Sequence, residues 1–151
     1  MPELPEVETI VRDLDKKLKN KKIIGVEILD KKFFQIKEKE LKNILGVKIK
    51  LVKRRAKMLV FNLEKKFLII HLKMTGQLVY QSKSKIIAGG HPIINSGQKL
   101  PNKFTRVIFK FNDKSFLYFN DVRKFGWLKL LDSKDLFDLE KKFGVEPLSR
   151  D

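Results

Sequence analysis

Short apolar segments separated by turn residues occupy most of the chain between positions 23 and 131, and this succession constrains the fold more than any other feature. Segments of this length that are rich in Val, Ile and Phe and are bounded by Gly, Asn or Asp are typical of strands. The expected strands cover residues 23–29, 33–36, 47–51, 58–63, 67–72, 77–80, 104–111, 115–119 and 127–131. The fold class is therefore expected to be mostly β, as a two-layer β-sandwich of about eight strands.

A helix is expected at each end of this run of strands. Residues 4–19 place apolar side chains on one helical stripe, and Pro5 suits the first helical position. The stripe consists of Leu4, Val7, Ile10, Val11, Leu14 and Leu18. A C-terminal helix is expected from a cap at Asp132 or Ser133 through Phe143, with Gly144 ending it. Residues 38–45 are expected to form one or two helical turns.

Residues 81–103 show no periodicity of apolar side chains, so a long loop is expected there. Five turn-forming residues support this interpretation: Gly89, Gly90, Pro92, Gly97 and Pro101. Loops of this length are usually functional or mobile. Gly25 marks a possible bulge in the first strand, and residues 112–114 form the expected turn of a hairpin.

Charge and cysteine content restrict the function. The 151 residues fit one domain, and 34 Lys and Arg against 18 Asp and Glu give a net charge of +16. Such a charge indicates a polyanionic partner, nucleic acid above all, although a generally lysine-rich composition is the alternative explanation. The absence of Cys excludes disulfides and a cysteine zinc site. No apolar run reaches transmembrane length.

The N-terminus combines three carboxylates with two prolines. Removal of Met1 would leave Pro2 with a secondary amine, which attacks a sugar carbon to give a cationic iminium. Glu3 is placed for proton transfer, and Glu6 and Glu8 suit the first turn of a helix. The alternative interpretation is purely structural, because prolines and acids are common where helices begin.

Three further stretches are candidates for binding. The basic cluster 53–57, expected between two strands, is either a solvated turn or a grip on phosphates. His71, at the end of an apolar strand in the stretch 70–76, is either a structural histidine or a functional one. The stretch 120–126 is either a simple turn or a basic and aromatic binding loop.

Residues 2–9, Pro-Glu-Leu-Pro-Glu-Val-Glu-Thr, resemble the opening of the formamidopyrimidine-DNA glycosylases, which are bacterial base-excision repair enzymes. The resemblance implies that Pro2 is the Schiff-base nucleophile, that Glu3 is its acid–base partner and that Glu6 is a second catalytic acid. A retained Met1 would block this nucleophile.

Two other stretches resemble the same family. Residues 54–57, Arg-Arg-Ala-Lys, match a family motif that implies phosphate contacts, with Lys57 close to the damaged nucleotide. Residues 71–76, His-Leu-Lys-Met-Thr-Gly, are similar to His-Leu-Gly-Met-Ser-Gly. By that match His71 contacts a phosphate, and Met74 fills the space left by an extruded base. Lys73 replaces the usual Gly, and it is expected either to add a phosphate contact or to alter the turn. The implied DNA-binding residues of these stretches are Arg54, Arg55, His71, Lys73 and Met74.

Residues 121–126, Asp-Val-Arg-Lys-Phe-Gly, are similar to the family's Asp-Pro-Arg-Arg-Phe-Gly. The match implies that Arg123 reads the orphaned base, that Phe125 is a wedge between bases and that Lys124 also binds DNA. A weaker match implies that Lys103 and Arg106 hold phosphate.

The resemblance implies excision of oxidised purines, 8-oxoguanine and formamidopyrimidines among them, followed by β,δ-elimination at the abasic site. The expected partner is damaged double-stranded DNA, and the expected protein is a monomer in the bacterial cytoplasm with no membrane association. Residues 1–151 are expected to form the N-terminal catalytic domain. The helix–two-turn–helix and zinc-finger domain, with the family's zinc site, is expected outside this chain, which holds no cofactor of its own. The alternative is a non-catalytic basic DNA-binding fragment.

Overall fold

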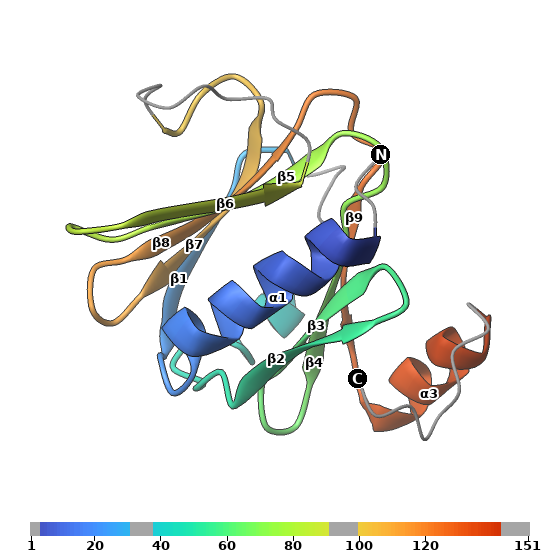
Figure 1. Ribbon diagram of the computed structural model, residues 1–151. Coiled ribbons are helices and arrows are strands. Elements are labelled where there is room, and N and C mark those ends of the chain that lie inside the picture. The colour runs from blue at the N-terminus through green and yellow to red at the C-terminus, as the bar shows by residue number, and fades with distance from the viewer. Residues whose placement is uncertain (1–3, 31–37, 91–99, 143–151) are drawn as a thin grey trace.

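A computed structural model describes residues 4–30, 38–90 and 100–142. Two antiparallel sheets pack face to face, which confirms the predicted β-sandwich (Figure 1). The five-stranded sheet has the order β1-β7-β8-β5-β6, and the four-stranded sheet has the order β2-β3-β4-β9. The strands are β1 (Ile23–Ile28), β2 (Leu51–Arg55), β3 (Met58–Asn62), β4 (Phe67–His71), β5 (Gly76–Gln81), β6 (Ile86–Gly90), β7 (Thr105–Phe111), β8 (Phe116–Asp121) and β9 (Trp127–Leu131). The helices are α1 (Leu4–Leu18), α2 (Glu38–Leu41) and α3 (Ser133–Lys142).

The main core lies between the two sheets and follows from the alternation of side chains along each strand. In β3, Leu59 and Phe61 point into this core, whereas Met58 and Val60 join a second cluster on the outer face of the four-stranded sheet. Both faces of the strand are therefore covered, which explains its unbroken apolar sequence.

Helix α1 closes the open side of the sandwich between the edge strands β6 and β2 (Figure 1). Its predicted stripe is buried from Val7 to Leu18, whereas Leu4 is 40% exposed. The Asp15 carboxylate accepts a hydrogen bond of 2.8 Å from the Val52 backbone N–H, so the helix also satisfies an N–H of the β2 edge. No helix in the described ranges is long and apolar enough to span a bilayer.

Helix α3 packs on the outer face of the four-stranded sheet through Leu136 and Leu139. Asp132 caps it: the carboxylate accepts a hydrogen bond of 2.8 Å from the Asp135 N–H. Of the two predicted caps, Asp132 is therefore correct. The predicted end of the helix at Phe143 and Gly144 lies outside the described residues.

Four predictions need correction or fall outside the described residues. The predicted strand 47–51 is wrong, because the strand runs from Leu51 to Arg55 and the preceding residues bond instead to the connection between α1 and β1. The basic cluster 53–57 consequently lies on β2 and its turn, not between strands. The predicted loop 81–103 contains strand β6. The predicted strand 33–36 lies outside the described residues, and the bulge at Gly25 is confirmed.

Candidate nucleic-acid interface

Strand register brings three connections to one end of the sandwich. Met58, His71 and Trp127 are direct neighbours across β3, β4 and β9, and Gly76 pairs with Asp121 across β5 and β8. The β2–β3 turn at 56–57, the β4–β5 loop at 72–75 and the β8–β9 loop at 122–126 therefore converge, as the right-hand side of Figure 1 shows. Six of the sequence-predicted site residues lie on these three connections, namely Lys57, Lys73, Met74, Arg123, Lys124 and Phe125.

Large side chains at this end are exposed. Met74 is 44% exposed and Phe125 is 49% exposed, and the Arg123 guanidinium lies 4.8 Å from the centre of the Phe125 ring. Apolar side chains that project beside cations, with no apolar cover from the rest of the described chain, are typical of an interaction site. The two loops that carry Met74, Arg123 and Phe125 lie side by side, because the Arg123 backbone N–H donates to the Thr75 hydroxyl at 3.1 Å.

Each of the three connections contains one non-glycine residue in the left-handed region. Their φ angles are 53° at Ala56, 51° at Lys73 and 60° at Lys124. This conformation favours glycine, because a Cβ crowds the following carbonyl oxygen. It gives a physical reason for the usual Gly at the position of Lys73.

His71 is buried beneath the β4–β5 loop, with its ring centre 5.5 Å from that of Trp127. Its Nδ1 accepts a hydrogen bond of 3.1 Å from the Lys73 backbone N–H, so the proton of the neutral ring is on Nε2. Burial above all, and then the charges of Lys73 and Lys57, lower the pKa of His71 to about 4. The side chain is therefore neutral at pH 7, and Lys57 lies close enough to influence it.

The two arginines of the basic cluster are engaged within the protein. Arg54 Nε lies 2.6 Å from a Glu8 carboxylate oxygen, and Arg54 Nη1 donates to the Ala56 carbonyl at 3.0 Å. Arg55 is buried, with a side chain only 3% exposed, and forms an ion pair with Glu140 of α3. Burial and the ion pair with Glu140 give Arg55 a structural role, and its contact with DNA stays a prediction.

Three other residues that are predicted to bind DNA have partners of different kinds. Lys124 Nζ lies 2.8 Å from an Asp30 carboxylate oxygen. Arg106 Nε donates to the backbone carbonyl of Asp121 at 2.9 Å, which ties the start of β7 to the β8–β9 loop. Lys103 is exposed, with its ammonium 5.1 Å from the centre of the Phe104 ring. Lys103 and Lys124 are both exposed, whereas Arg106 is half-buried.

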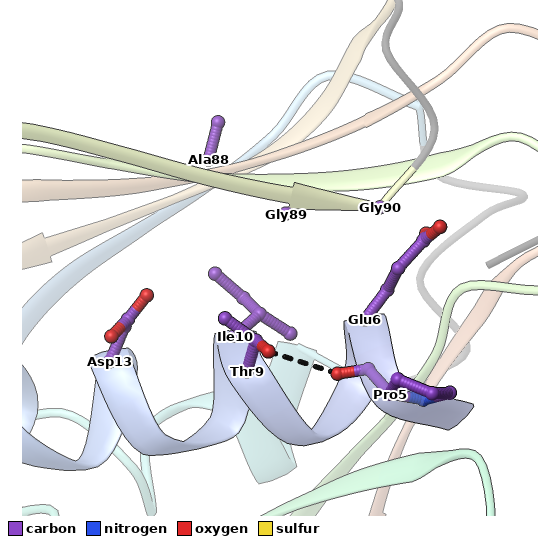
Figure 2. A pocket seen from close by; sticks show the side chains of 8 residues that line it. All are labelled: Pro5, Glu6, Thr9, Ile10, Asp13, Ala88, Gly89 and Gly90. Atoms are coloured by element: carbon purple, nitrogen blue, oxygen red, sulfur yellow. Dashed lines mark hydrogen bonds between the residues drawn. The ribbon is translucent and has the colours of Figure 1, made fainter. Parts of the chain in front are cut away.

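A groove of about 360 Å³ runs between α1 and β6 (Figure 2). Glu6, Ile10 and Asp13 project from the helix toward the strand, and the Glu6 carboxylate points toward Gly90. The groove begins at Pro5 and Glu6. The start of α1 lies at the same end of the sandwich as the three connections (Figure 1). The predicted nucleophile Pro2 and its partner Glu3 lie outside the described residues.

A buried carboxylate without a role predicted from the sequence joins two of the connections. Asp121 is fully buried, and its Oδ2 accepts a hydrogen bond of 2.8 Å from the Gly126 N–H. Its Oδ1 accepts from the Lys124 N–H at 3.1 Å and from the Thr75 hydroxyl. Two signals in the sequence mark this residue: it is the Asp that begins the motif at 121–126, and it ends a strand before a short loop that ends in Gly.

In the described ranges, no three His, Asp or Glu side chains gather closely enough to hold a metal ion.

Comparisons with known proteins find similarity over most or all of the chain. The family model described as "Formamidopyrimidine-DNA glycosylase N-terminal domain" matches residues 1–128. The formamidopyrimidine-DNA glycosylase of Pelotomaculum thermopropionicum is 42% identical over 98% of this chain and 50% of its own length. That of Streptococcus pneumoniae serotype 4 is 38% identical over all of this chain and 51% of its own length. The chain thus spans about half the length of the curated relatives it matches.

Solved structures agree with these relatives. The Lactococcus lactis FPG protein in complex with FAPY-dG containing DNA superposes with a TM-score of 0.76 and 30% sequence identity, covering 93% of this chain and 48% of that one. A complex of the same protein with abasic-site DNA superposes with the same TM-score. The similarity therefore includes the arrangement of the two sheets as well as the motifs.

Proposed function

The chain belongs to the formamidopyrimidine-DNA glycosylase family, and from that premise we propose that it is the catalytic half of an enzyme that removes oxidised purines from double-stranded DNA. The observation that carries the proposal is the convergence of Met74, Arg123 and Phe125 beside Lys57 and His71 at one end of the sandwich. A basic surface with projecting apolar side chains suits a duplex that has lost one base from its stack.

The proposed reaction begins at the amine of Pro2 once Met1 has been removed. The amine attacks C1′ of the damaged nucleotide, the bond between C1′ and the base breaks, and the base leaves with a proton. Opening of the sugar ring gives an iminium that joins Pro2 to C1′. Loss of a C2′ proton then expels the 3′ phosphate, and a second elimination expels the 5′ phosphate. Glu3 moves protons in these steps, and the exposed Glu6 is the second acid beside them.

Extrusion of the base costs a few kcal/mol, roughly, because stacking and pairing are lost. Met74 and Phe125 offset part of this cost in the proposed complex, because exposed apolar side chains enter the space that the base has left. The Arg123 guanidinium donates hydrogen bonds to the base that has lost its partner. Each of these roles needs the side chain to project from the protein.

Lys57, Lys73 and His71 are the proposed phosphate contacts. The neutral His71 donates one hydrogen bond from Nε2 and adds no charge, whereas the two lysines add Coulomb attraction. Neutral and charged donors side by side fix the position of the backbone without a large cluster of repelling cations.

The first test is borohydride trapping of this chain on a duplex with 8-oxoguanine opposite cytosine. A covalent protein–DNA band supports both a free Pro2 amine and extrusion of the base. A band only on an abasic-site duplex supports the amine and assigns base recognition to sequence outside this chain. No band on either duplex contradicts catalysis by this chain and leaves the alternative, a non-catalytic DNA-binding fragment.

The matched control for this test is Pro2→Gly. It is expected to abolish trapping while duplex binding stays nearly unchanged, and an equal loss of trapping and binding would contradict the nucleophile assignment. The intact mass of the protein shows whether Met1 is retained. Full retention of Met1 is incompatible with a Pro2 nucleophile, because Pro2 then has no free amine.

A further inference from the structure

The three exposed residues Met74, Arg123 and Phe125 come from two loops that are far apart in the sequence. Both loops are irregular, and each includes a lysine in the left-handed region, Lys73 and Lys124. Short loops of this kind hold a fixed shape only when other groups determine it. The relative position of the two loops therefore depends on groups other than the exposed side chains that they carry.

The link between the loops is a short chain of buried hydrogen bonds. The Thr75 hydroxyl in the β4–β5 loop donates to Asp121 Oδ1 and accepts from the Arg123 backbone N–H at 3.1 Å. The Asp121 carboxylate also receives the backbone N–H groups of Lys124 and Gly126 in the β8–β9 loop. Three consecutive or near-consecutive N–H groups of one loop are thus bound by two side chains, one of which belongs to the other loop.

The local packing favours this arrangement. A Cβ at Gly126 would lie 2.8 Å from Asp121 Oδ2 and 2.8 Å from the His71 backbone oxygen. Only glycine lets the carboxylate reach its donors while the loop passes over the end of β4. Thr75 is 8% exposed and Asp121 is fully buried, so water is a poor substitute for either partner.

We propose that Thr75 and Asp121 are positioning residues that lock the β4–β5 and β8–β9 loops into one rigid unit, so that Met74, Arg123 and Phe125 enter DNA together. The proposal rests on the function proposed above. A rigid unit has less freedom to lose on binding than two independent loops. Because the Thr75 hydroxyl accepts a hydrogen bond from the Arg123 N–H, it fixes the backbone position of the residue that is proposed to read the orphaned base.

Thr75→Val tests the lock, because it keeps the shape of the side chain and removes the hydroxyl. NMR relaxation of the full 151-residue chain is expected to show backbone order parameters falling from about 0.85 toward 0.6 in both loops. Thr75→Ser keeps the hydroxyl and is expected to restore them. Asp121→Asn is expected to have the same effect as Thr75→Val. One carboxylate oxygen becomes an NH2 group, which then faces an N–H or O–H donor instead of accepting its hydrogen bond.

The matched control is Ser115→Ala, which removes a buried hydroxyl bound to Asp113 at the opposite end of β8. It is expected to leave the order parameters of both loops unchanged. If Thr75→Val loosens only residues 72–75 and leaves 122–126 rigid, the proposed lock is overturned. This measurement needs no DNA, so it decides the lock even if this chain proves inactive.

The functional measurement compares two DNA substrates. Thr75→Val is expected to slow covalent trapping about tenfold or more on the 8-oxoguanine duplex, or on the abasic duplex if only that one is trapped, because the inserting residues are misplaced. Trapping on a single-stranded abasic oligonucleotide, which requires no extrusion, is expected to stay within about twofold. Equal losses on both substrates would overturn the positioning role, and absence of trapping by the unmodified chain would count against the proposed function alone.

Discussion

At the scale of single residues, Lys73 combines backbone strain with a proposed phosphate contact. Its φ of 51° is one that glycine adopts at no cost, so Lys73→Gly is expected to raise the free energy of unfolding by up to about 1 kcal/mol. The same change removes a cation and is expected to lower the magnitude of the salt slope of duplex binding by about 1. Urea denaturation and binding titrations at several salt concentrations measure the two effects.

Lys114→Gly is the control for this separation. Lys114 has a φ of 68° in the β7–β8 turn, at the opposite end of the sandwich. The Lys114→Gly variant should show a similar increase in the free energy of unfolding without any change in DNA binding. A loss of stability in Lys73→Gly would mean that the lysine side chain makes contacts that outweigh the strain.

His71 predicts a pH dependence of stability at the same scale. Its pKa is about 4 in the folded protein, below the ordinary value of 6.5, so the unfolded chain takes up a proton first as the pH falls. The free energy of unfolding is therefore expected to be highest above pH 6.5 and to decrease from there toward pH 4. The sequence contains a second histidine, His91, so the experiment is done in a His91→Gln background. In that background, thermal denaturation of His71→Gln is expected to lack this part of the curve. An unchanged curve would contradict the buried neutral histidine.

At the scale of elements, the sequence predicts those strands that carry their own apolar pattern and bounding turn residues, whether the paired strand is near, as for β7 and β8, or distant, as for β1 and β7. The hairpin of β7 and β8 is an example, because its alternation and its turn residues lie within one stretch. Strand β6 was not predicted, because residues 86–90 show no alternation and are held by β5 on one side and by α1 on the other. Arg55 shows the same limit within the site: its partner Glu140 is on α3, far along the chain, and no local pattern reveals the pair.

The contact between α1 and β6 predicts a strong effect of one methyl group. A Cβ on Gly89 would lie 2.6 Å from Ile10 Cβ, so Gly89→Ala is expected to destabilise the protein by about 1–3 kcal/mol through overpacking. Gly25→Ala in β1 is the control, because the nearest atom would be a flexible Lys110 carbon at 3.4 Å. Chemical denaturation of both variants measures the difference, and equal stabilities would contradict the close approach of the helix.

The buried ion pair between β2 and α3 predicts an asymmetric response to substitution. Glu140→Gln leaves the Arg55 charge buried without its counterion and is expected to cost about 3–5 kcal/mol. The double variant Arg55→Met, Glu140→Leu is expected to cost much less, because no charge remains buried. Glu27→Gln, at a surface pair 4.0 Å from Lys110, should cost less than about 1 kcal/mol. A double variant as unstable as Glu140→Gln alone would show that the pair's packing, not its charge, matters.

At the scale of the whole molecule, a net charge of +16 on a 151-residue chain makes binding to any polyanion favourable, so affinity alone says little about the proposed interface. The salt dependence says more, because its slope counts the phosphates that are contacted. If the interface at the end bearing Lys57 contacts about six phosphates, the logarithm of the duplex affinity should fall with a slope of about −5 against the logarithm of the salt concentration.

Single substitutions then locate those contacts on the surface. Lys57→Ala is expected to reduce the magnitude of the slope by about 1, whereas Lys65→Ala, in the exposed β3–β4 turn at the opposite end of the sandwich, is expected to leave it unchanged. Fluorescence anisotropy with a labelled duplex between 50 and 200 mM salt, roughly, gives both slopes. Equal effects at the two ends would mean that the net charge attracts DNA without a defined site. That result would contradict a DNA interface at the three connections.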